Sequence, residues 1–454
     1  MRQPKAVVMV IAGLDPSGGA GLSADIRALA SLGVYCAPIV AAITAQDTRG
    51  VYSVRPVGAS LLEAQLRPVL EDLRPKWAKV GVLFSAENIR LVAQLADRGV
   101  RLVVDPVLRA GTGEPLIEPG ALDVLREELV ARAFVITPNA REAGELTGIK
   151  VRTVEDAREA AKILAEMGPR GVVVKGGHIE GPEAVDVLYH DGVFYEFRRP
   201  RMAHDAHGSG CVFSSLLAGL LALGEDLPSA VRKAGNMAYR ALKWAIGPGS
   251  GRPVVEPMAE LLREAERYKV LMEVEEAVRA FLAEPSSPYF IPEVGTQIGM
   301  SLPMPEGPED VAAVEGRIIR VGGRARAAGP VRFGASSHIA RIIVASSEHD
   351  PGVRAAMNLA YRPELVKALE EIGLSVVLID RAREPPEVAA VEGASLSWAV
   401  KEAVRELGRV PDVIYDLGAV GKEPMVRLLG RSAREVVARA IRAMRRASRA
   451  ARRV

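Results

Sequence analysis

Strand-like apolar runs alternate with helix-like patterns through the first half of the chain. Val7–Ala12 is a continuous apolar run, Leu22–Leu32 has apolar residues at helical spacing, and Val34–Thr44 is again apolar. The alternation continues with a helix at 61–73, a strand at 78–82, a helix at 86–97 and a strand at 102–104. Such alternation predicts a largely parallel sheet between two layers of helices, with ligands at the carboxyl ends of the strands.

The second half predicts another α/β domain, which shows no similarity to the first. A charged helical pattern at 259–282 leads into a Pro- and Ser-rich segment at 284–295. We therefore expect a domain over 1–258, a helical linker over 259–284 and a second domain over 285–454. Beyond the linker, strands are predicted at 316–323, 342–345, 374–380 and 412–416, and helices at 352–368, at 395–407 and from 424 to the tail.

Composition excludes several classes of protein. The 454 residues, 49% of them hydrophobic, suit two or three globular domains. Lys and Arg (59) nearly balance Asp and Glu (56), which predicts many surface ion pairs and gives no general signal for binding a polyanion. Cys36 and Cys211 are the only cysteines, so a disulfide framework and a Cys-based zinc site are excluded. No apolar segment approaches membrane-spanning length. We expect a cytoplasmic protein without a membrane partner.

Polar and glycine-rich stretches follow five of the predicted strands. Each has an ordinary structural explanation: glycine loops and Asp-Pro pairs form turns, and Asn139 could simply cap a helix, with Glu142 in the capping-box position. Their common position at one edge of a parallel sheet instead favours a ligand site. The stretches are Gly13–Gly21, Gln46–Gly50, Asp105–Arg109, Thr137–Glu142 and Lys175–His178.

A sixth stretch, Asp205–Cys211, precedes the apolar run Val212–Leu223. Its glycines allow a ligand to approach the backbone closely, and the N-terminus of the following helix favours an anion. We predict a phosphate in transfer at this point. The alternative is a glycine-rich turn that only starts a buried helix.

Together, these motifs resemble those of the hydroxymethylpyrimidine/phosphomethylpyrimidine kinases, which belong to the ribokinase-like kinases. The resemblance covers about residues 5–250 and lacks a Walker A lysine loop, as the superfamily's different anion site implies. It implies a ribokinase-like three-layer α/β/α fold, use of ATP and Mg²⁺, and phosphorylation of 4-amino-5-hydroxymethyl-2-methylpyrimidine and of its phosphate. The motifs are Gly13–Gly21, Ala45–Gly50, Asp105–Val107, Thr137–Glu142, Lys175–His178 and His207–Cys211.

The resemblance also implies catalytic roles. The backbone amides of Gly208, Ser209, Gly210 and Cys211 would hold the transferring phosphoryl group, with Ser209 also at the nucleotide. Cys211 would act as the base, if the helix N-terminus lowers its pKa toward neutrality. The alternative roles for Cys211 are a small buried apolar residue or a contact to the pyrimidine.

Further roles concern the metal, the nucleotide and the substrate. Asn139 and Glu142 match the motif that holds Mg²⁺ and its waters, and Asp105 supports the same region. Lys175 resembles the lysine that meets the nucleotide phosphates. Implied substrate contacts are Asp25 and Gln46 at the aminopyrimidine edge and hydroxymethyl group, Gly13 through close backbone approach, and Val82 and Val107 in the pocket.

Arginines crowd one stretch of the second half. Guanidinium groups favour bidentate phosphate contacts, so an anion site is one interpretation, and a solvated basic face is the other. These arginines are Arg317, Arg320, Arg324 and Arg326, followed by the stretch Arg332–Arg341.

The second half resembles the archaeal-type thiamine-phosphate synthase domain over about residues 285–440. The matching stretches are Val314–Gly323, Arg332–Arg341, Asp350–Asn358 and Val413–Met425. The resemblance implies coupling of the pyrimidine pyrophosphate made by the first domain to thiazole phosphate, with release of pyrophosphate. A sensor of thiamine phosphate is the alternative function. No helix-turn-helix segment precedes this domain, which favours the enzyme.

Site residues of the second domain follow from the same resemblance. Arg320 would neutralise the pyrophosphate, His338 would donate to it, Arg341 and Lys422 would assist, and Asp416 would orient the aminopyrimidine. His338 could instead be a core or surface histidine. The Arg-rich tail has the spacing of a packed amphipathic helix, so we expect no nucleic-acid partner. We expect a homodimer.

Overall fold

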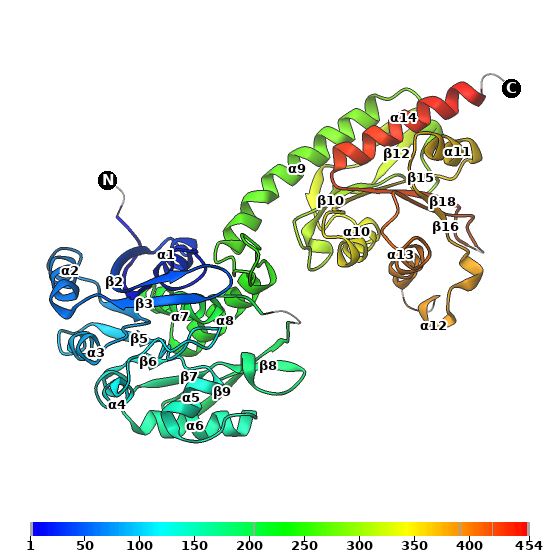
Figure 1. The fold of residues 1–454 in the computed structure, drawn as a ribbon. Coiled ribbons are helices and arrows are strands. Elements are labelled where there is room, and N and C mark those ends of the chain that lie inside the picture. Colours follow the sequence, from blue (N-terminus) through cyan, green and yellow to red (C-terminus); the bar gives the residue numbers. More distant parts are fainter. Residues whose placement is uncertain (1–2, 203–204, 390, 392, 420, 452–454) are drawn as a thin grey trace. The chain divides into compact units, whose positions relative to one another are not determined.

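The computed structural model describes residues 3–202, 205–389, 391, 393–419 and 421–451, and the chain divides into two compact units between Leu261 and Leu262. Each unit has its own sheet and its own cores (Figure 1). Within the described residues, no helix is both long enough and apolar enough to cross a membrane.

A nine-stranded sheet forms the centre of the first unit. Its strands are β1 (Val7–Leu14), β2 (Tyr35–Gln46), β3 (Val51–Pro56), β4 (Trp77–Val80), β5 (Arg101–Val104), β6 (Val135–Ile136), β7 (Gly171–Val174), β8 (Glu183–His190) and β9 (Val193–Pro200). They lie in the order β3-β2-β1-β4-β5-β6-β7-β8-β9. The pairs from β2 to β7 are parallel, and the antiparallel pairs lie at the two edges. The predicted largely parallel sheet is confirmed.

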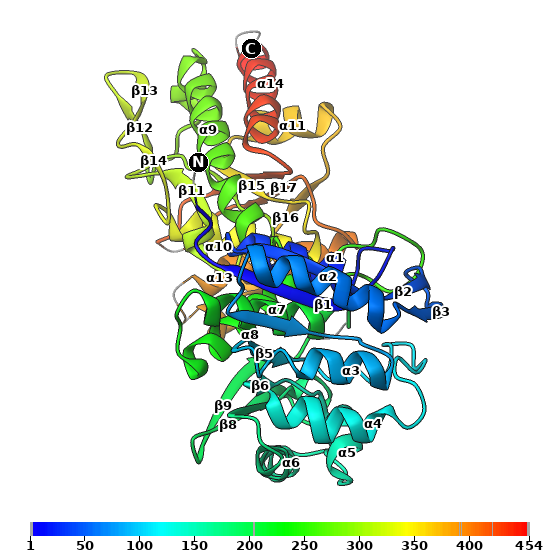
Figure 2. The same ribbon diagram turned by 90° about the vertical axis from the view of Figure 1, so that its left-hand side faces the viewer.

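Helices cover both faces of this sheet (Figure 2). On β1, Val8 and Val10 belong to one core while Met9 and Ile11 belong to the other, because successive strand residues point to opposite faces. The predicted three-layer arrangement is therefore confirmed. One core contains residues of α1 (Gly21–Ser31), α7 (Ser209–Ala222) and α8 (Leu227–Lys243), and the other contains residues of α2 (Ala59–Asp72), α3 (Ala86–Ala93), α4 (Ala121–Val124), α5 (Ala140–Thr147) and α6 (Val154–Glu166).

The second unit is a separate α/β domain, as predicted. Its strands are β10 (Ile298–Ser301), β11 (Val311–Val314), β12 (Ile318–Val321), β13 (Arg324–Ala327), β14 (Val331–Phe333), β15 (Ala355–Ala360), β16 (Val376–Leu378), β17 (Val413–Asp416) and β18 (Met425–Gly430). The main sheet has the order β14-β11-β10-β15-β18-β17-β16, and β12 pairs with β13 in a separate hairpin. Strands β16 and β17 are parallel, and the other pairs of the main sheet are antiparallel.

Helices also cover both faces of the second sheet. Helix α9 (Ala259–Ala283) covers most of the segment predicted as a linker, but Val270, Val274 and Phe281 are buried in a core of the second unit, so this part of α9 is built into that unit. The helices of this core are α9, α11 (Pro363–Glu371) and α14 (Ala433–Ala451), and those of the opposite core are α10 (Ser337–His349) and α13 (Ala394–Leu407).

Three predicted elements of the second unit are wrong. The apolar run 342–345 lies inside helix α10, the segment 352–368 contains strand β15 before helix α11, and the segment from 424 begins with strand β18. Apolar runs this short fit a buried helix as well as a strand, so periodicity alone does not separate the two. The helical start of α10 is fixed locally by the Ser336 side chain, which accepts the Ile339 N–H at 3.5 Å.

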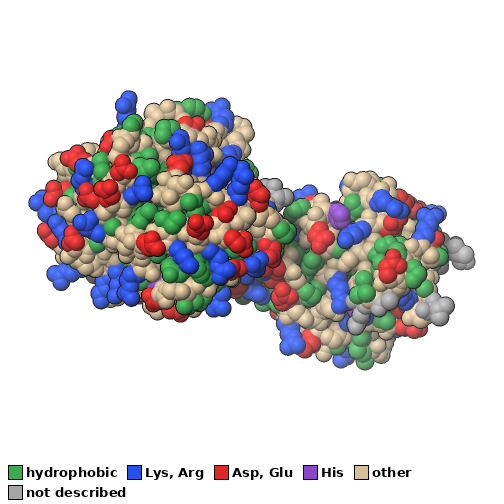
Figure 3. Space-filling model, turned by 90° about the horizontal axis from the view of Figure 1, so that it is seen from below, with side chains coloured by type: hydrophobic (Ala, Val, Ile, Leu, Met, Phe, Trp, Pro, Cys, Tyr) green, Lys and Arg blue, Asp and Glu red, His purple; other side chains and the backbone are tan. Residues whose placement is uncertain are grey.

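Opposite charges are interspersed on the surface, as the balanced composition predicts. On the face shown in Figure 3, basic and acidic side chains lie among one another on both units. Ion pairs include Arg198 with Glu196 at 2.7 Å and Lys233 with Glu225 at 2.5 Å.

Candidate active site

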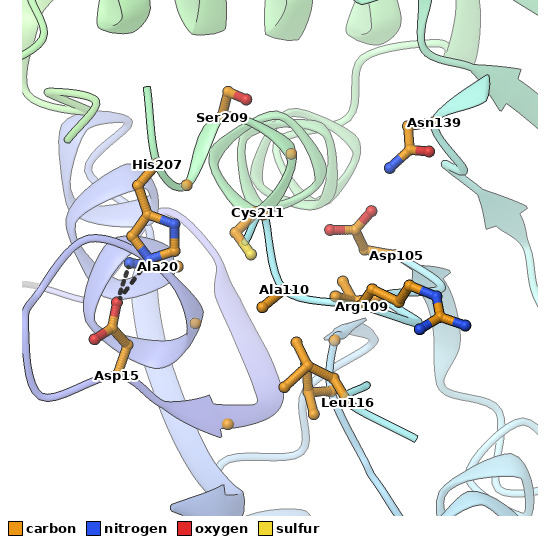
Figure 4. A pocket seen from close by; sticks show the side chains of 18 of the residues that line it. Asp15, Ala20, Asp105, Arg109, Ala110, Leu116, Asn139, His207, Ser209 and Cys211 are labelled. Carbon is orange, nitrogen blue, oxygen red and sulfur yellow. Dashed lines mark hydrogen bonds and ion pairs between the residues drawn. The ribbon is translucent and has the colours of Figure 1, made fainter. Parts of the chain in front are cut away.

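A cavity of about 390 Å³ lies in the first unit where the central strands end. Figure 4 shows part of its lining, with Cys211 between the Asp15–His207 pair and Asp105. Apart from Asp25, the residues that the sequence predicted for this unit all line the cavity: Gly13, Gln46, Val82, Asp105, Val107, Asn139, Glu142, Lys175, Gly208, Ser209, Gly210 and Cys211.

The N-terminus of helix α7 opens onto this cavity. Its N-cap residue Gly208 has φ 92° and, as a glycine, has no side chain to cap the helix. A Cβ at Gly208 would overlap the carbonyl oxygen of Gly19, so the glycine loop and the start of α7 are in backbone contact that only glycine permits. The uncapped amides and the positive end of the helix dipole form a site for an anion.

A lysine lies beside this helix end. The Lys175 Nζ donates to Asp105 Oδ1 at 2.7 Å and lies 3.0 Å from the point where a Cβ on Gly210 would stand. Burial lowers the pKa of Lys175, but the charges of Asp105 and Glu142 outweigh it and raise the pKa. A charged ammonium therefore stands against the positive end of α7, which favours an anion between the two.

Asn139 and Glu142 form the capping box that was the alternative interpretation of this motif. Asn139 Oδ1 accepts the Glu142 N–H at 2.9 Å, and Glu142 Oε2 accepts the Asn139 N–H at 2.8 Å. Both residues also line the cavity, so capping does not exclude a binding role. Burial raises the pKa of Glu142 to about 7, with Lys175 opposing and Asp105 reinforcing the shift.

These donors fit a hydrated Mg²⁺ rather than a metal held directly by many ligands. Among the described residues, no group of three or more His, Cys, Asp or Glu side chains could hold a metal ion. Mg²⁺ usually keeps several waters and takes one or two carboxylates. The second oxygen of Glu142, beside the carboxylate of Asp105, supplies that kind of hard donor.

Asp25 does not line the cavity, which corrects its predicted contact with the substrate. It lies on the buried face of α1, where Oδ2 accepts from Lys79 Nζ at 2.8 Å and Oδ1 accepts from Ser215 Oγ at 2.7 Å. Lys79 is fully buried yet borders the cavity. Burial lowers the pKa of Lys79, but the charges of Asp25, Cys211 and Asp105 outweigh it and raise the pKa. The sequence analysis did not assign Lys79. The signal that could have found it is a single charged residue inside an otherwise apolar predicted strand.

We expect Lys79→Met to lower the free energy of unfolding by about 3–5 kcal/mol, because the carboxylate of Asp25 stays buried without its partner. The double variant Lys79→Met/Asp25→Leu should regain most of this loss, since apolar replacement of both partners is often neutral. Urea unfolding of the full chain, followed by a probe of the first unit, measures both. A single variant as stable as the wild type would show that the ion pair contributes nothing.

Cys211 lines the cavity, but its thiol is not activated in the way the sequence predicted. Burial raises the pKa of Cys211 to about 11; Lys79 opposes the shift, and Asp25 and Asp105 reinforce it. The condition attached to its role as base, a pKa near neutrality, is therefore not met, because desolvation and two nearby carboxylates outweigh the charge of Lys79.

Two residues that sequence reasoning did not assign join Gln46 at the cavity. His207 Nε2 lies 3.1 Å from Asp15 Oδ2 and 2.8 Å from Gln46 Nε2. Burial raises the pKa of Asp15, but hydrogen bonds from His207 and Ser17 outweigh it and lower the pKa. The contact ties the first glycine loop to the stretch that starts α7. The sequence signal that could have found Asp15 and His207 is their place in the motifs Gly13–Gly21 and His207–Cys211.

The predicted residues of the second unit fall into two separate places. Arg320 lies on the exposed hairpin β12–β13, which packs through Ile318 and Ala325 on the face that carries α9, α11 and α14. His338 and Arg341 lie at the start of α10, on the opposite face of the sheet. Figures 1 and 2 both draw the hairpin away from α10. The sheet therefore separates Arg320 from His338 within one chain, which corrects their predicted joint site.

Asp416 and Lys422 lie near the end of β17. Asp416 is buried, and its Oδ2 accepts from Arg427 at 2.6 Å and from Arg381 at 3.1 Å. Burial raises the pKa of Asp416, but the two guanidinium groups outweigh it and lower the pKa. Its Oδ1 accepts the N–H of Gly418 at 3.0 Å, so this carboxylate is engaged on both oxygens and does not present a free edge to an aminopyrimidine, contrary to the prediction.

The first unit has the layout of a ribokinase-like small-molecule kinase: a parallel sheet between helices, with a helix N-terminus, a lysine and carboxylates around one cavity at the strand ends. The phosphomethylpyrimidine kinase family model matches residues 15–256, and the thiamine-phosphate synthase family model matches residues 273–442. The chain belongs to the family of bifunctional thiamine-biosynthesis proteins in which these two domains are fused.

Similar proteins match either the whole chain or its first half. The bifunctional thiamine biosynthesis protein of Methanocaldococcus jannaschii is 32% identical over 437 residues, which cover 95% of this chain and 96% of that protein. The hydroxymethylpyrimidine/phosphomethylpyrimidine kinase of Bacillus subtilis is 37% identical over 247 residues, 54% of this chain and 91% of that protein. The pyridoxal kinase of Staphylococcus aureus, solved with AMP-PCP and pyridoxal, has a TM-score of 0.53 and 29% identity, over 56% of this chain and 94% of that chain.

Proposed function

We propose that the first unit phosphorylates 4-amino-5-hydroxymethyl-2-methylpyrimidine and then its phosphate, with ATP as the donor, and that the second unit couples the resulting pyrophosphate ester to thiazole phosphate. The observation that carries the kinase assignment is the meeting of the α7 N-terminus with Lys175 and Asp105 at one cavity. The second family domain on the same chain supports the coupling step. Homodimerisation and a cytoplasmic location stay predictions of the sequence.

In the first phosphorylation, the hydroxymethyl oxygen attacks the γ-phosphorus of ATP, and the bond from that phosphorus to the β–γ bridging oxygen breaks. The amides of Gly208–Cys211 receive the charge that develops on the transferring phosphoryl oxygens. Lys175 holds the nucleotide phosphates as a point charge, and Asp105 fixes its position. The hydroxyl proton leaves to a base, for which Cys211, in the first turn of α7 at the cavity, is the candidate.

In the second phosphorylation, an oxygen of the phosphate monoester attacks another γ-phosphorus. That oxygen is already ionised near neutral pH, so the step needs no base. Gln46, Gly13, Val82 and Val107 line the cavity and hold the pyrimidine, while the Asp15–His207 contact positions Gln46. Mg²⁺, held through its waters by Asn139 and Glu142, would supply charge neutralisation on the nucleotide phosphates.

In the coupling step, the thiazole nitrogen attacks the pyrimidine methylene carbon, and the bond from that carbon to the pyrophosphate oxygen breaks. The site must hold pyrophosphate as it leaves, which requires cations and hydrogen-bond donors. His338, Arg341 and Lys422 lie on one side of the second unit and supply such groups.

Incubation of the full chain with the hydroxymethylpyrimidine, thiazole phosphate and Mg-ATP should yield thiamine phosphate and pyrophosphate. Chromatography with phosphorus detection follows both products. Accumulation of the pyrimidine pyrophosphate alone would refute the coupling reaction and favour a sensor of thiamine phosphate, and absence of any phosphorylated pyrimidine would refute the kinase.

A further inference from the structure

The N-terminus of α13 in the second unit repeats the local geometry of the α7 N-terminus. Gly393 is the N-cap residue of α13 with φ 83°, Gly208 is that of α7 with φ 92°, and neither glycine has a side chain to cap its helix. Helix α13 lies in the connection between the parallel strands β16 and β17, after the short helix α12 (Pro386–Ala389).

Arg341 lies directly against this helix end. A Cβ built on Gly393 would overlap the guanidinium group of Arg341, and Arg341 Nη1 is buried without a hydrogen-bond partner among the described residues. The arrangement parallels Lys175 at Gly210 in the first unit. A guanidinium facing the positive end of a helix is unfavourable unless an anion shares the space.

Two further cations converge on the same end. Lys422 Nζ donates to the hydroxyl of Ser395, the second residue of α13, at 3.3 Å. Arg381 follows β16; its side chain is 8% exposed, and its Nε is buried without a hydrogen-bond partner among the described residues. These unused donors belong to guanidinium groups, which favour phosphoryl oxygens.

A carboxylate of the chain itself stands among these cations. The side chain of Glu384 is 5% exposed, and its Oε2 lies 3.5 Å from Arg381 Nη1 and 3.5 Å from Lys422 Nζ. Among the described residues, its Oε1 is buried without a hydrogen-bond partner. Burial raises the pKa of Glu384, but Ser395, Lys422 and Arg381 outweigh it and lower the pKa. The carboxylate thus occupies part of the space that an external anion would use.

We propose that the α13 N-terminus, with Arg341, Arg381 and Lys422, binds a phosphoryl dianion, and that Glu384 competes with this ligand. The proposal rests on the proposed coupling function for its biological ligand, which is either the phosphate of thiazole phosphate or pyrophosphate. Both present oxygens that the guanidinium groups and the helix amides can receive together. Arg320, on the other face of the sheet, takes no part in this site.

Calorimetric titration of the full chain with inorganic pyrophosphate, and separately with inorganic phosphate, tests the site. The kinase cavity is first saturated with a non-hydrolysable ATP analogue. Arg341→Gln should weaken binding in the second unit at least about tenfold, because the lost guanidinium donates to the ligand. Arg383→Gln is the matched control, since it removes an exposed arginine of the same segment and should leave binding unchanged. Unchanged binding in Arg341→Gln would overturn the proposal.

Glu384→Gln gives the opposite expected result. Removing the competing charge should tighten pyrophosphate binding about threefold or more, a gain that a purely structural role of Glu384 would not produce. Weaker binding in this variant would overturn the competition. An unchanged urea-unfolding transition of the second unit in each variant confirms that this unit is folded.

The titrations also separate this proposal from the proposed function. If anion binding depends on Arg341 but the protein makes no thiamine phosphate, the anion site stands and the synthase function is refuted. If Arg341→Gln still makes thiamine phosphate, with an unchanged KM for thiazole phosphate and unchanged inhibition by pyrophosphate, the synthase function stands and the anion site is refuted. Of the two probes, stronger binding of phosphate would assign the site to the thiazole phosphate, and stronger binding of pyrophosphate would assign it to the leaving group.

Discussion

Gly208→Ala is expected to reduce kcat/KM of both phosphorylations about a thousandfold. The left-handed φ of 92° alone costs alanine about 1–2 kcal/mol. The added Cβ also overlaps the carbonyl oxygen of Gly19, a backbone atom that cannot rotate away. The start of α7 must therefore move, and a displacement of about 1 Å in groups that stabilise a transition state costs on the order of a hundredfold or more. Steady-state kinetics with each pyrimidine substrate measures the loss.

Gly224→Ala is the matched control for this prediction. Gly224 also has a left-handed φ, 96°, but a Cβ there meets nothing within 4 Å. Its substitution should cost stability alone and leave both phosphorylation rates near those of the wild type. Equal losses in the two variants would mean that backbone strain, rather than the contact with Gly19, accounts for the effect. Supplied pyrimidine pyrophosphate should still be coupled by Gly208→Ala, because the second unit has its own cores.

The kinase cavity could largely be predicted from the sequence because its residues follow strands of one parallel sheet. Asp105 comes directly after β5 and Lys175 directly after β7, so the topology alone brings them to the same edge. Asp25 shows the limit of this reasoning. It lies within α1 rather than after a strand, and its side chain points into the protein, where it accepts a hydrogen bond from Lys79, a residue 54 positions away. Contacts of this range leave no local pattern.

The second unit was harder to predict because most of its sheet is antiparallel. Successive antiparallel strands end at opposite edges of the sheet, so the polar residues that follow them lie at different edges. Motifs that are neighbours in the sequence therefore need not meet in space. Arg320 and His338 lie only 18 positions apart in the sequence, yet they belong to elements on opposite faces. By contrast, Arg341 and Gly393 are far apart in the sequence and in contact, which no spacing rule could have shown.

The pKa of Cys211 predicts a strong pH dependence for the first phosphorylation. With a pKa of about 11, only a small fraction of the thiol is ionised at neutral pH, and this fraction grows about tenfold for each unit of pH below that value. If the thiolate takes the hydroxyl proton, the single-turnover rate with the alcohol should rise about tenfold per unit between pH 7 and 9. The rate with the phosphate monoester should stay nearly flat, because its attacking oxygen is ionised throughout.

Cys211→Ala should remove this slope from the alcohol reaction and leave the second phosphorylation nearly unchanged. Cys36→Ala is the matched control: burial raises the pKa of Cys36 to about 12, and this residue does not border the cavity. If the rate of the alcohol reaction still rises with pH in Cys211→Ala, another group accepts the hydroxyl proton, and the thiol only contacts the pyrimidine. Equal rate losses in both phosphorylations would likewise assign Cys211 a positioning role, because only base catalysis distinguishes an alcohol from an ionised phosphate.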